Sequence, residues 1–532
     1  MRRLLWILPL LLLLASCNNY RASRGPADWI YVSETGNDST GDGSSGNPYL
    51  TISKGVTEAT VGDTVYIVAG TYNINATIDV PVGISIMGEG SSTILSSTAS
   101  GSHDLYGYSP IFNLESISEG TYGSQSISHM HMNGNDTIAD GGIMIYRRSG
   151  VEIHNISMEN FHYYGIRNRG GAMPPVVHAT GNVIHDCIIY NCGGPNVSFG
   201  NIQIGGQEGM LIYNNHVFQP QRNGYNRAGF PIKYLAGGNN HGLKIYNNDM
   251  QLEEGDEYDE WHIAVELFHC CGGIEIYNNR FWGVVDFSDY VGAFGTNDTE
   301  GYGFAVKIYD NIMGGNAPTS EETYGVTFER STSGGAYVYN NLIKNVRSGI
   351  ALVNPNDNGI TEDIYIYNNI IHSFGRTGSA SGYGVVVGRL SDTQTTAFED
   401  IYILNNTIVD NSTGQPTAGI YIRGGTNVSF SNVNIKNNIV QGIRAGTAYS
   451  IWFNKVICDE VNVENNNLYD CDSVTTTYTD CTITSTTDQN NLTADPLFRS
   501  SGYFRLQSTS PCINAGLSVG LTSDFAGHRV PQ

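Results

Sequence analysis

Charged and polar side chains recur at fixed positions in a series of short apolar segments. The segments are residues 165–169, 201–205, 231–235, 262–266 and 325–329. If the first aliphatic residue of each points inward, the next residue and the third after it point outward. The first outward row then holds Arg167, Gln203, Lys233 and Ala264. A second row beside it holds Arg169, Gly205, Leu235, Glu266 and Glu329. A solvated scaffold face would scatter its charges, so these rows indicate a functional surface.

Two kinds of acid–base chemistry suit these residue types. Removal of a proton next to a carboxylate needs a base such as Lys233 and a positive group such as Arg167 or Arg169. Hydrolysis of a glycosidic bond needs two carboxyl groups, one as acid and one as base or nucleophile. The candidates are Glu266, Asp286 and Glu329. The competing interpretation of Lys233 is an exposed, solvated side chain.

The elements that must position these residues follow from an internal repeat. Asparagine pairs occur at 214–215, 247–248, 278–279, 340–341, 368–369, 405–406, 437–438 and 465–466, with Asp310-Asn311 in the gap. Most starts differ by about 30 residues, which is a solenoid period. Alternating apolar residues before each pair predict a short strand, and a Gly-rich turn leads to another. We therefore predict stacked coils whose corner asparagines hydrogen-bond to those above and below.

The sequence resembles the right-handed parallel β-helix proteins of the pectate-lyase-like superfamily. Residues 29–72 resemble the opening of such proteins, with a short capping helix near residues 52–59. Residues 494–516 and 524–532 resemble their closing tail. The resemblance implies an all-β, single-stranded right-handed parallel β-helix. It also implies a sugar-binding groove on one sheet, in which Lys or Arg commonly acts as the base of a lyase, often with Ca²⁺. The superfamily also includes hydrolases and adhesins.

Long aromatic insertions surround the charged rows, at residues 218–231, 252–262 and 284–303. Loops raised around the middle of a solenoid usually wall a groove. The candidate substrate-binding residues are Arg169, Gln203, Tyr234, Trp261 and His262. The weak candidates for Ca²⁺ ligands are Glu253, Glu254, Asp256 and Asp259, although they lack a recognisable loop spacing. No P-loop, GxSxG or HExxH motif is present.

The chain has 532 residues and a formal net charge of −23, from 27 basic and 50 acidic residues. Nucleic-acid binding normally needs a basic face, so this acidity argues against such a partner. We expect a monomer whose partner is a polysaccharide.

The N-terminus predicts export. Arg2 and Arg3 precede a short apolar run, and residues 14–17 (Leu-Ala-Ser-Cys) resemble the lipobox of bacterial lipoproteins. Cys17 would carry the lipid, which would be the protein's sole contact with a membrane, and Asn18 after it favours the outer membrane. We expect a signal peptide at 1–17, a tether at 18–28, the β-helix with its cap at 29–495 and a closing segment at 496–532. The eight further cysteines are expected to be buried thiols or a few disulfides.

These expectations combine into one functional hypothesis with two alternatives. The leading one is a cell-surface polysaccharide lyase with Lys233 as base and Arg167 and Arg169 near the substrate carboxylate. The first alternative is a glycoside hydrolase that uses Glu266 with Asp286 or Glu329. The second is a non-catalytic carbohydrate-binding or adhesion protein.

Overall fold

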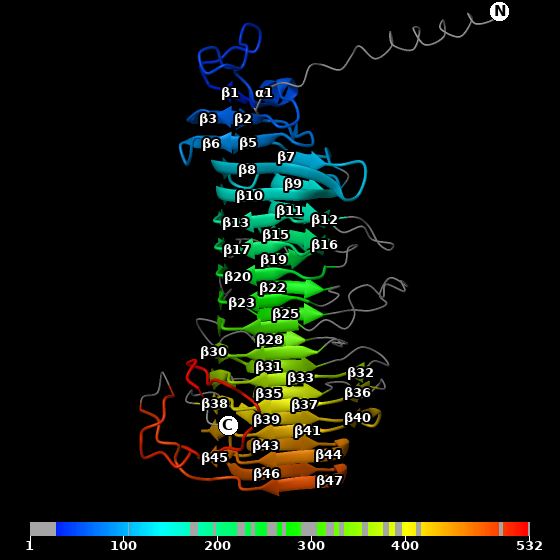
Figure 1. Cartoon of the computed structure of the whole chain (residues 1–532), viewed down its shortest axis with the longest axis vertical. Helices are drawn as coiled ribbons and strands as arrows, with labels where there is room; N and C mark the ends of the chain where they lie inside the picture. The colour runs from blue at the N-terminus through cyan, green and yellow to red at the C-terminus, as the bar shows by residue number, and fades with distance from the viewer. Residues whose placement is uncertain are drawn as a thin grey trace, which may run out of the picture.

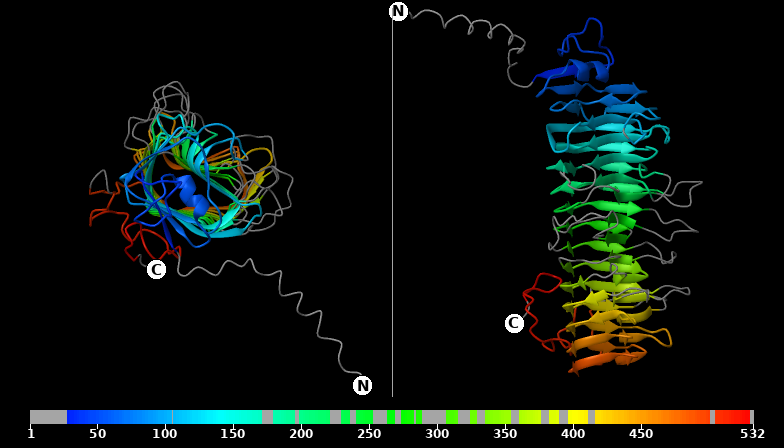
Figure 2. Two further views of the ribbon diagram at one scale, coloured as in Figure 1. Left: turned by 90° about the horizontal axis from the view of Figure 1, so that it is seen from above. Right: turned by 90° about the vertical axis from the view of Figure 1, so that its right-hand side faces the viewer.

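The chain winds into a right-handed parallel β-helix whose coils stack along one long axis (Figure 1). The computed structural model describes residues 28–104, 106–170, 179–194, 198–220, 229–235, 240–252, 263–268, 273–282, 284–288, 306–314, 324–328, 335–353, 360–375, 382–388, 396–410, 416–499 and 504–529. Each strand pairs in parallel with the equivalent strand of the next coil. The three strand faces enclose one apolar core, as the view from above shows (Figure 2).

One face, here called the front sheet, carries the predicted charged rows. It consists of β4 (Ile78–Asp79), β7 (Pro110–Glu115), β9 (Gly141–Tyr146), β11 (Tyr164–Arg169), β15 (Gly200–Gly205), β19 (Phe230–Tyr234), β22 (Ile263–Phe268), β25 (Val284–Ser288), β28 (Tyr324–Phe328), β31 (Ser348–Val353), β35 (Gly382–Gly388), β39 (Pro416–Arg423), β43 (Tyr449–Asn454) and β46 (Ser473–Thr479). The segments predicted from alternation therefore form strands, with bounds that differ by one or two residues.

The other two faces meet at the asparagine corners. Strands before the corners are β1 (Trp29–Val32), β2 (Thr64–Ile67), β5 (Ser85–Gly88), β13 (Val183–His185), β17 (Leu211–Tyr213), β20 (Lys244–Tyr246), β23 (Glu275–Tyr277), β26 (Val306–Tyr309), β29 (Ala336–Tyr339), β33 (Ile364–Tyr367), β37 (Ile401–Leu404), β41 (Val433–Lys436), β44 (Ile457–Glu464) and β47 (Thr482–Gln489). Strands after them are β3 (Gly70–Ile74), β6 (Thr93–Ser97), β14 (Ile188–Tyr190), β18 (His216–Gln219), β21 (Asp249–Leu252), β24 (Arg280–Trp282), β27 (Ile312–Gly314), β30 (Leu342–Val346), β34 (Ile370–Phe374), β38 (Thr407–Val409), β42 (Ile439–Gln441) and β45 (Asn467–Tyr469). Strands β8 (Thr121–Asn133) and β10 (Arg148–Glu159) run through both faces. Short strands β12 (Ala179–Thr180), β16 (Gln207–Glu208), β32 (Ile360–Thr361), β36 (Thr396–Phe398) and β40 (Val428–Phe430) complete the set.

The second asparagine of each pair forms the predicted ladder. Asn279 shows the pattern: its backbone N–H and its Nδ2 both donate to Oδ1 of Asn311, at 2.9 and 3.0 Å. Asn311 donates in the same way to Asn341. The ladder continues through Asn215, Asn248, Asn279, Asn311, Asn341, Asn369, Asn406, Asn438, Asn466 and Asn491. Buried amides are thus satisfied by their equivalents in neighbouring coils.

The first asparagine of each pair turns the chain. Asn214, Asn247, Asn278 and Asn340 have φ near +55°, the left-handed region that Asn tolerates better than most residues. The tyrosines just before the pairs stack on the outer surface, with ring centroids 5.0 Å apart between Tyr246 and Tyr277. The repeated Ile-Tyr-Asn-Asn therefore encodes an inward aliphatic residue, an outer stacked ring, a turn and a ladder amide.

Helix α1 (Ile52–Glu58) lies at the N-terminal end of the stack (Figures 1 and 2). The Thr51 side chain caps it by accepting a hydrogen bond from the Lys54 backbone N–H at 3.2 Å. Its buried residues are Ile52, Gly55 and Val56. Gly55 permits the close contact, because a Cβ there would lie 2.7 Å from Cγ2 of Val32.

The C-terminal segment lies along the side of the stack in the part that the structure describes (Figures 1 and 2). Asn437 exchanges two hydrogen bonds of 2.8 Å with the backbone of Leu517. Asn368 donates to the Ser523 carbonyl at 2.8 Å. We call residues 504–529 the tail.

The ladder predicts a strong contrast between a ladder asparagine and a turn asparagine of two neighbouring corners. Asn311→Ala leaves both Asn279 donors without their acceptor, so we expect it to lower the free energy of unfolding by about 2–4 kcal/mol. Asn278→Gly keeps the left-handed turn, so we expect a change below about 1 kcal/mol. Chemical unfolding of both variants measures the difference. Equal losses would contradict the ladder's role.

Candidate functional site

A column of outward positions crosses the front sheet. The backbone register pairs Arg167 with Gln203 and Gln203 with Lys233. Ile232 pairs with Val265, so Glu266 follows Lys233 in the column. Glu266 pairs with Asp286, and Asp286 with Thr327. We call Arg167, Gln203, Lys233 and Glu266 the charged column, with Asp286 and Thr327 as its next register positions.

The predicted row was correct for Arg167, Gln203 and Lys233 and wrong for Ala264. The position beside Lys233 belongs to Glu266, which the sequence placed in the second row. The cause is a register irregularity in β22 between Ile263 and Val265, which shifts every later residue of that strand relative to a count from its first aliphatic residue.

Lys233 and Glu266 form an ion pair between adjacent coils, through Lys233 Nζ and Glu266 Oε2. Their side chains are only 12% and 8% exposed, so water screens the attraction little. The Lys233 ammonium also lies 4.5 Å from the centroid of the Tyr234 ring and 5.1 Å from that of Phe230. These contacts hold Lys233 in a fixed place.

Gln203 separates this ion pair from Arg167. It is almost fully buried, and its Nε2 donates to the Tyr163 carbonyl at 3.3 Å. Arg167 and Lys233 are therefore two coils apart, about 10 Å at the usual strand spacing.

Arg167 lies in an aromatic cage. Its Cζ is 4.8, 5.1 and 5.6 Å from the ring centroids of Tyr106, Tyr108 and Tyr164. The residue is 8% exposed, and within the described residues its Nε and Nη1 have no hydrogen-bond partner. Buried guanidinium donors without an acceptor are costly, so in the described structure Arg167 is held mainly by the three aromatic rings. Arg169 lies beside it, with its Cζ 4.4 Å from the same Tyr106 ring, which confirms the predicted proximity of the two arginines.

Two of the cage tyrosines, Tyr106 and Tyr108, come from the loop between β6 and β7, which lies outside the repeat, and the third, Tyr164, is on β11. Asp104 Oδ1 accepts the backbone N–H groups of Tyr106 and Tyr108, both at 2.8 Å. Asp140 Oδ2 accepts those of Gly101 and Ser109 at 2.9 Å, and burial raises the pKa of Asp140. Because this loop carries no repeat signal, sequence reasoning did not identify Tyr106 or Tyr108.

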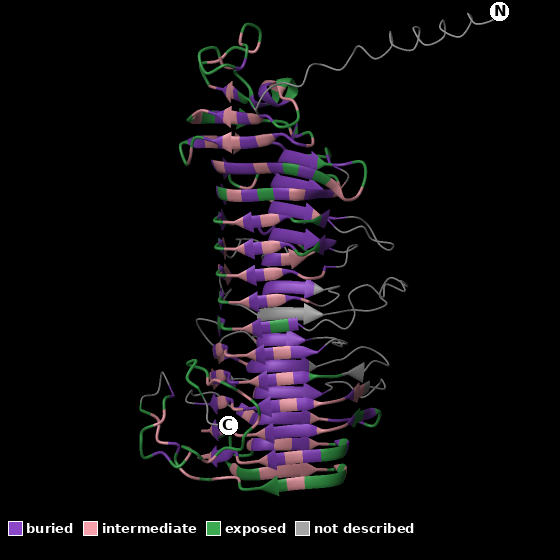
Figure 3. Ribbon diagram, in the orientation of Figure 1, coloured by how far each residue is buried: buried purple, intermediate pink, exposed green. Residues whose placement is uncertain are grey.

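The column loses its charge toward the C-terminus. Thr327 pairs with Ala351, and the following positions are Val386, Tyr421 and Trp452. Ala351, Val386 and Tyr421 are buried, and Tyr421 stacks on Trp452 with centroids 4.5 Å apart. Figure 3 shows that much of the front sheet is buried, whereas β46 at its C-terminal end is partly exposed. Beyond Thr327, the column positions from β31 to β43 are therefore apolar or aromatic.

Several predicted residues lie outside the described part of the chain. They are Cys17, Glu253, Glu254, Asp256, Asp259, Trp261, His262 and Glu329. Asp286 is described by its backbone register alone. Among the described residues, no group of three or more His, Cys, Asp or Glu could hold a metal ion.

Two further findings concern the described residues. No helix there is long and apolar enough to cross a membrane. Cys187, Cys192, Cys458, Cys471, Cys481 and Cys512 are thiols and not disulfides. Burial raises the pKa of Cys187 to about 12, so its thiol is unreactive.

No protein-family model and no curated protein sequence matches the chain. Solved structures with a similar fold include the Agl-KA catalytic domain, at 16% identity and a TM-score of 0.46, over 70% of this chain and 63% of that one. The chain thus spans less than two thirds of that domain. The catalytic domain of a GH87 α-1,3-glucanase in complex with tetrasaccharides is similar at 16% identity and a TM-score of 0.44, over 88% and 70%. Pectate lyase Pel9A is similar at 12% identity and a TM-score of 0.34, over 94% and 95%. At such low scores, none of them indicates which reaction or residues this chain uses.

The unsatisfied donors of Arg167 predict a stability change opposite to that of an ordinary buried arginine. Arg167→Met keeps the volume and removes an unpaired charge, so we expect unfolding stability unchanged or raised by up to about 2 kcal/mol. The matched control is Arg148→Met, because buried Arg148 donates to Ser116, Val80 and Gln125. We expect the control to lose about 3–5 kcal/mol. A comparable loss in Arg167→Met would show that Arg167 is structural.

Proposed function

We propose that this protein binds a uronate-containing polysaccharide at the charged column and cleaves it there by β-elimination. The observation that carries the proposal is the caged Arg167, with two buried N–H groups that lack an acceptor among the described residues. A carboxylate is the natural acceptor for a planar guanidinium, which can bind it through two parallel hydrogen bonds. Arg169 adds a second positive charge at the same ring.

Elimination needs the carboxylate charge reduced and a base at the neighbouring carbon. Arg167 and Arg169 meet the first need, since withdrawal of charge from a carboxylate makes its α-proton more acidic. Lys233 in its neutral form takes that proton, a C=C bond forms, and the C–O bond to the leaving sugar breaks. The leaving oxygen then takes a proton from water. Because a lysine can act as a base only in its neutral form, we expect the rate to rise with pH.

Location is part of the proposal. The lipobox-like residues 14–17 support export and attachment through Cys17, which would bring the column to extracellular glycans. The outer membrane remains the proposed site of attachment, because Asn18 follows the cysteine.

A second candidate, glycoside hydrolysis, is favoured by one observation. Glu266 and Asp286 occupy paired positions of adjacent coils, so their backbones are one strand spacing apart, about 4.8 Å. Retaining glycosidases use carboxyl groups about 5–5.5 Å apart. Glu329, the other predicted partner, lies outside the described residues, and the described strand β28 ends at Phe328.

Two substitutions separate these reactions. If Lys233 is the base, Lys233→Ala should lower the rate about 10²- to 10⁴-fold. Glu266→Gln should then retain activity, because the elimination uses no carboxyl group of the protein. If Glu266 acts in hydrolysis, Glu266→Gln should abolish cleavage at every pH.

The assay uses the protein without its lipid anchor and a panel of uronate and neutral polysaccharides. Ultraviolet absorbance reports unsaturated ends, and a reducing-end assay reports total cleavage. Lys307→Ala is the matched control, because Lys307 is an exposed lysine on β26, in a different face. Reducing ends without absorbance would overturn elimination in favour of hydrolysis. Binding with neither product would identify a non-catalytic binding protein.

A further inference from the structure

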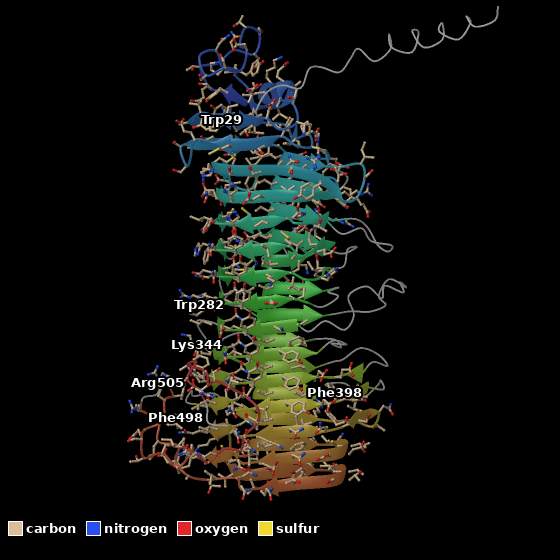
Figure 4. All side chains as sticks on the ribbon, viewed as in Figure 1. Trp29, Trp282, Lys344, Phe398, Phe498 and Arg505 are labelled. Atoms are coloured by element: carbon tan, nitrogen blue, oxygen red, sulfur yellow. The ribbon has the colours of Figure 1, made fainter. Side chains whose placement is uncertain are left out.

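Tyr122 presents an exposed aromatic ring at the edge of the front sheet. It follows β7 at the start of β8 and is 63% exposed. This edge lies beyond the C-terminal ends of the front strands, where Figure 4 labels Phe398 in a later coil. A Cβ at Gly150 would be 2.6, 2.7 and 3.0 Å from Cζ, Cε2 and Cε1 of the ring. Only a point above the ring plane is so close to all three atoms. One ring face therefore packs on Gly150, and the opposite face is open to solvent.

A β-bulge gives the ring this direction. Directly after Tyr122, two residues of β8 stand opposite Gly150 alone. Bulges occur beside binding sites, where they re-aim a side chain. Gly150 has φ +63°, and any side chain there would collide with the ring. The backbone of two coils therefore fixes the orientation of Tyr122.

Arg147, three residues before Gly150, brings a positive charge to the same turn. Its Nη1 donates to the Ile117 carbonyl at 3.2 Å, and its Cζ lies 4.6 Å from the centroid of the Tyr146 ring. The side chain is 29% exposed, and Oε1 of Glu119 is 3.8 Å from Nε, too far for a hydrogen bond. Unlike the buried Nε, Nη2 is accessible, and it has no acceptor among the described residues. A ligand can therefore accept a hydrogen bond from Nη2.

The backbone of Arg147 is strained. Its φ is +57°, in the left-handed region, which is costly for a residue with a long side chain. The equivalent residue two coils later is Gly206, with φ +63°. Glycine would adopt this conformation more easily, so the chain keeps the arginine at a cost. Strain of this kind is concentrated at functional positions.

These two side chains continue the line of the arginine cage. The Arg147 backbone N–H donates to the Arg169 carbonyl at 2.9 Å. The Tyr146 ring, which contacts Arg147, meets the Tyr106 ring edge-on at 5.6 Å, and Tyr106 in turn contacts Arg169. Contacts therefore run without a break from the cage to the turn that holds Tyr122.

We propose that Arg147 and Tyr122 form an outer subsite for the polysaccharide, an inference that rests on the proposed function. The C–H face of a sugar ring stacks on Tyr122, and a carboxylate of the glycan accepts a hydrogen bond from Arg147. The cage arginines and Arg147 bind carboxylates of different sugars. The preferred glycan therefore carries uronates on several sugars of one chain.

Calorimetry with the full chain without its lipid tests the subsite, with polygalacturonate, alginate and their oligosaccharides as probes. We expect Tyr122→Ala and Arg147→Gly each to weaken binding of long oligosaccharides about tenfold, and to leave binding of the shortest ones unchanged. Tyr122→Phe should retain affinity, because it keeps the ring. Glycine suits the left-handed backbone, so Arg147→Gly should leave the unfolding midpoint in denaturant little changed.

Tyr190→Ala is the matched control, because Tyr190 is an exposed tyrosine on β14, in another face. It should leave binding unchanged. Full affinity for long oligosaccharides in both Tyr122→Ala and Arg147→Gly would overturn the subsite, even where elimination is confirmed. Equal losses for short and long oligosaccharides would also overturn it, because an outer subsite touches only long chains.

The remaining outcomes separate this inference from the proposed cleavage. Binding that both variants weaken, without unsaturated products, would overturn the elimination and support the subsite. Absence of binding to either polymer would overturn both proposals.

Discussion

The stacked amide of the corner asparagine is the interaction on which the rest of this molecule depends. Each ladder amide accepts from the coil before it and donates to the coil after it, so the coils must keep one register. A slip by one residue would unpair buried donors in the adjacent coils and turn every side chain of the shifted strand to the opposite face. The apolar core stabilises the stack as a whole, but aliphatic side chains alone would tolerate such slips far better.

Because the register is fixed, side chains from separate strands come together in one site. Lys233 and Glu266 are 33 residues apart and meet because their strands are adjacent coils. Arg167 is placed by the same rule two coils earlier, and its cage is completed by a loop that two aspartates fix through backbone N–H groups. The scaffold thus sets the distances between side chains along the column in steps of one strand spacing. The loops determine how far each of these side chains is shielded from water.

The sequence predicted the parts of this structure that obey the repeat. Alternation and the asparagine pairs located the coils, the ladder and the row of Arg167, Gln203 and Lys233. The bulge in β22 moved Glu266 into that row, and no residue type in the segment signals a bulge. Tyr106 and Tyr108 were missed for a different reason: they meet Arg167 across about 60 residues of chain, from a loop whose conformation depends on carboxylate–backbone bonds. Local periodicity has no information about such long-range contacts.

The ladder also has a direction. In every link one amide N–H donates toward the C-terminal coils and the amide oxygen accepts from the N-terminal side, while the amide nitrogen also donates to a backbone carbonyl of the preceding coil. The aligned bond dipoles add along the axis as they do in an α-helix, so each amide polarises the next. The ladder therefore has an electrically positive end at Asn491. There Nδ2 of Asn491 donates to the carboxylate of Asp488 at 2.8 Å, and an anion compensates the accumulated field at the place where it is strongest.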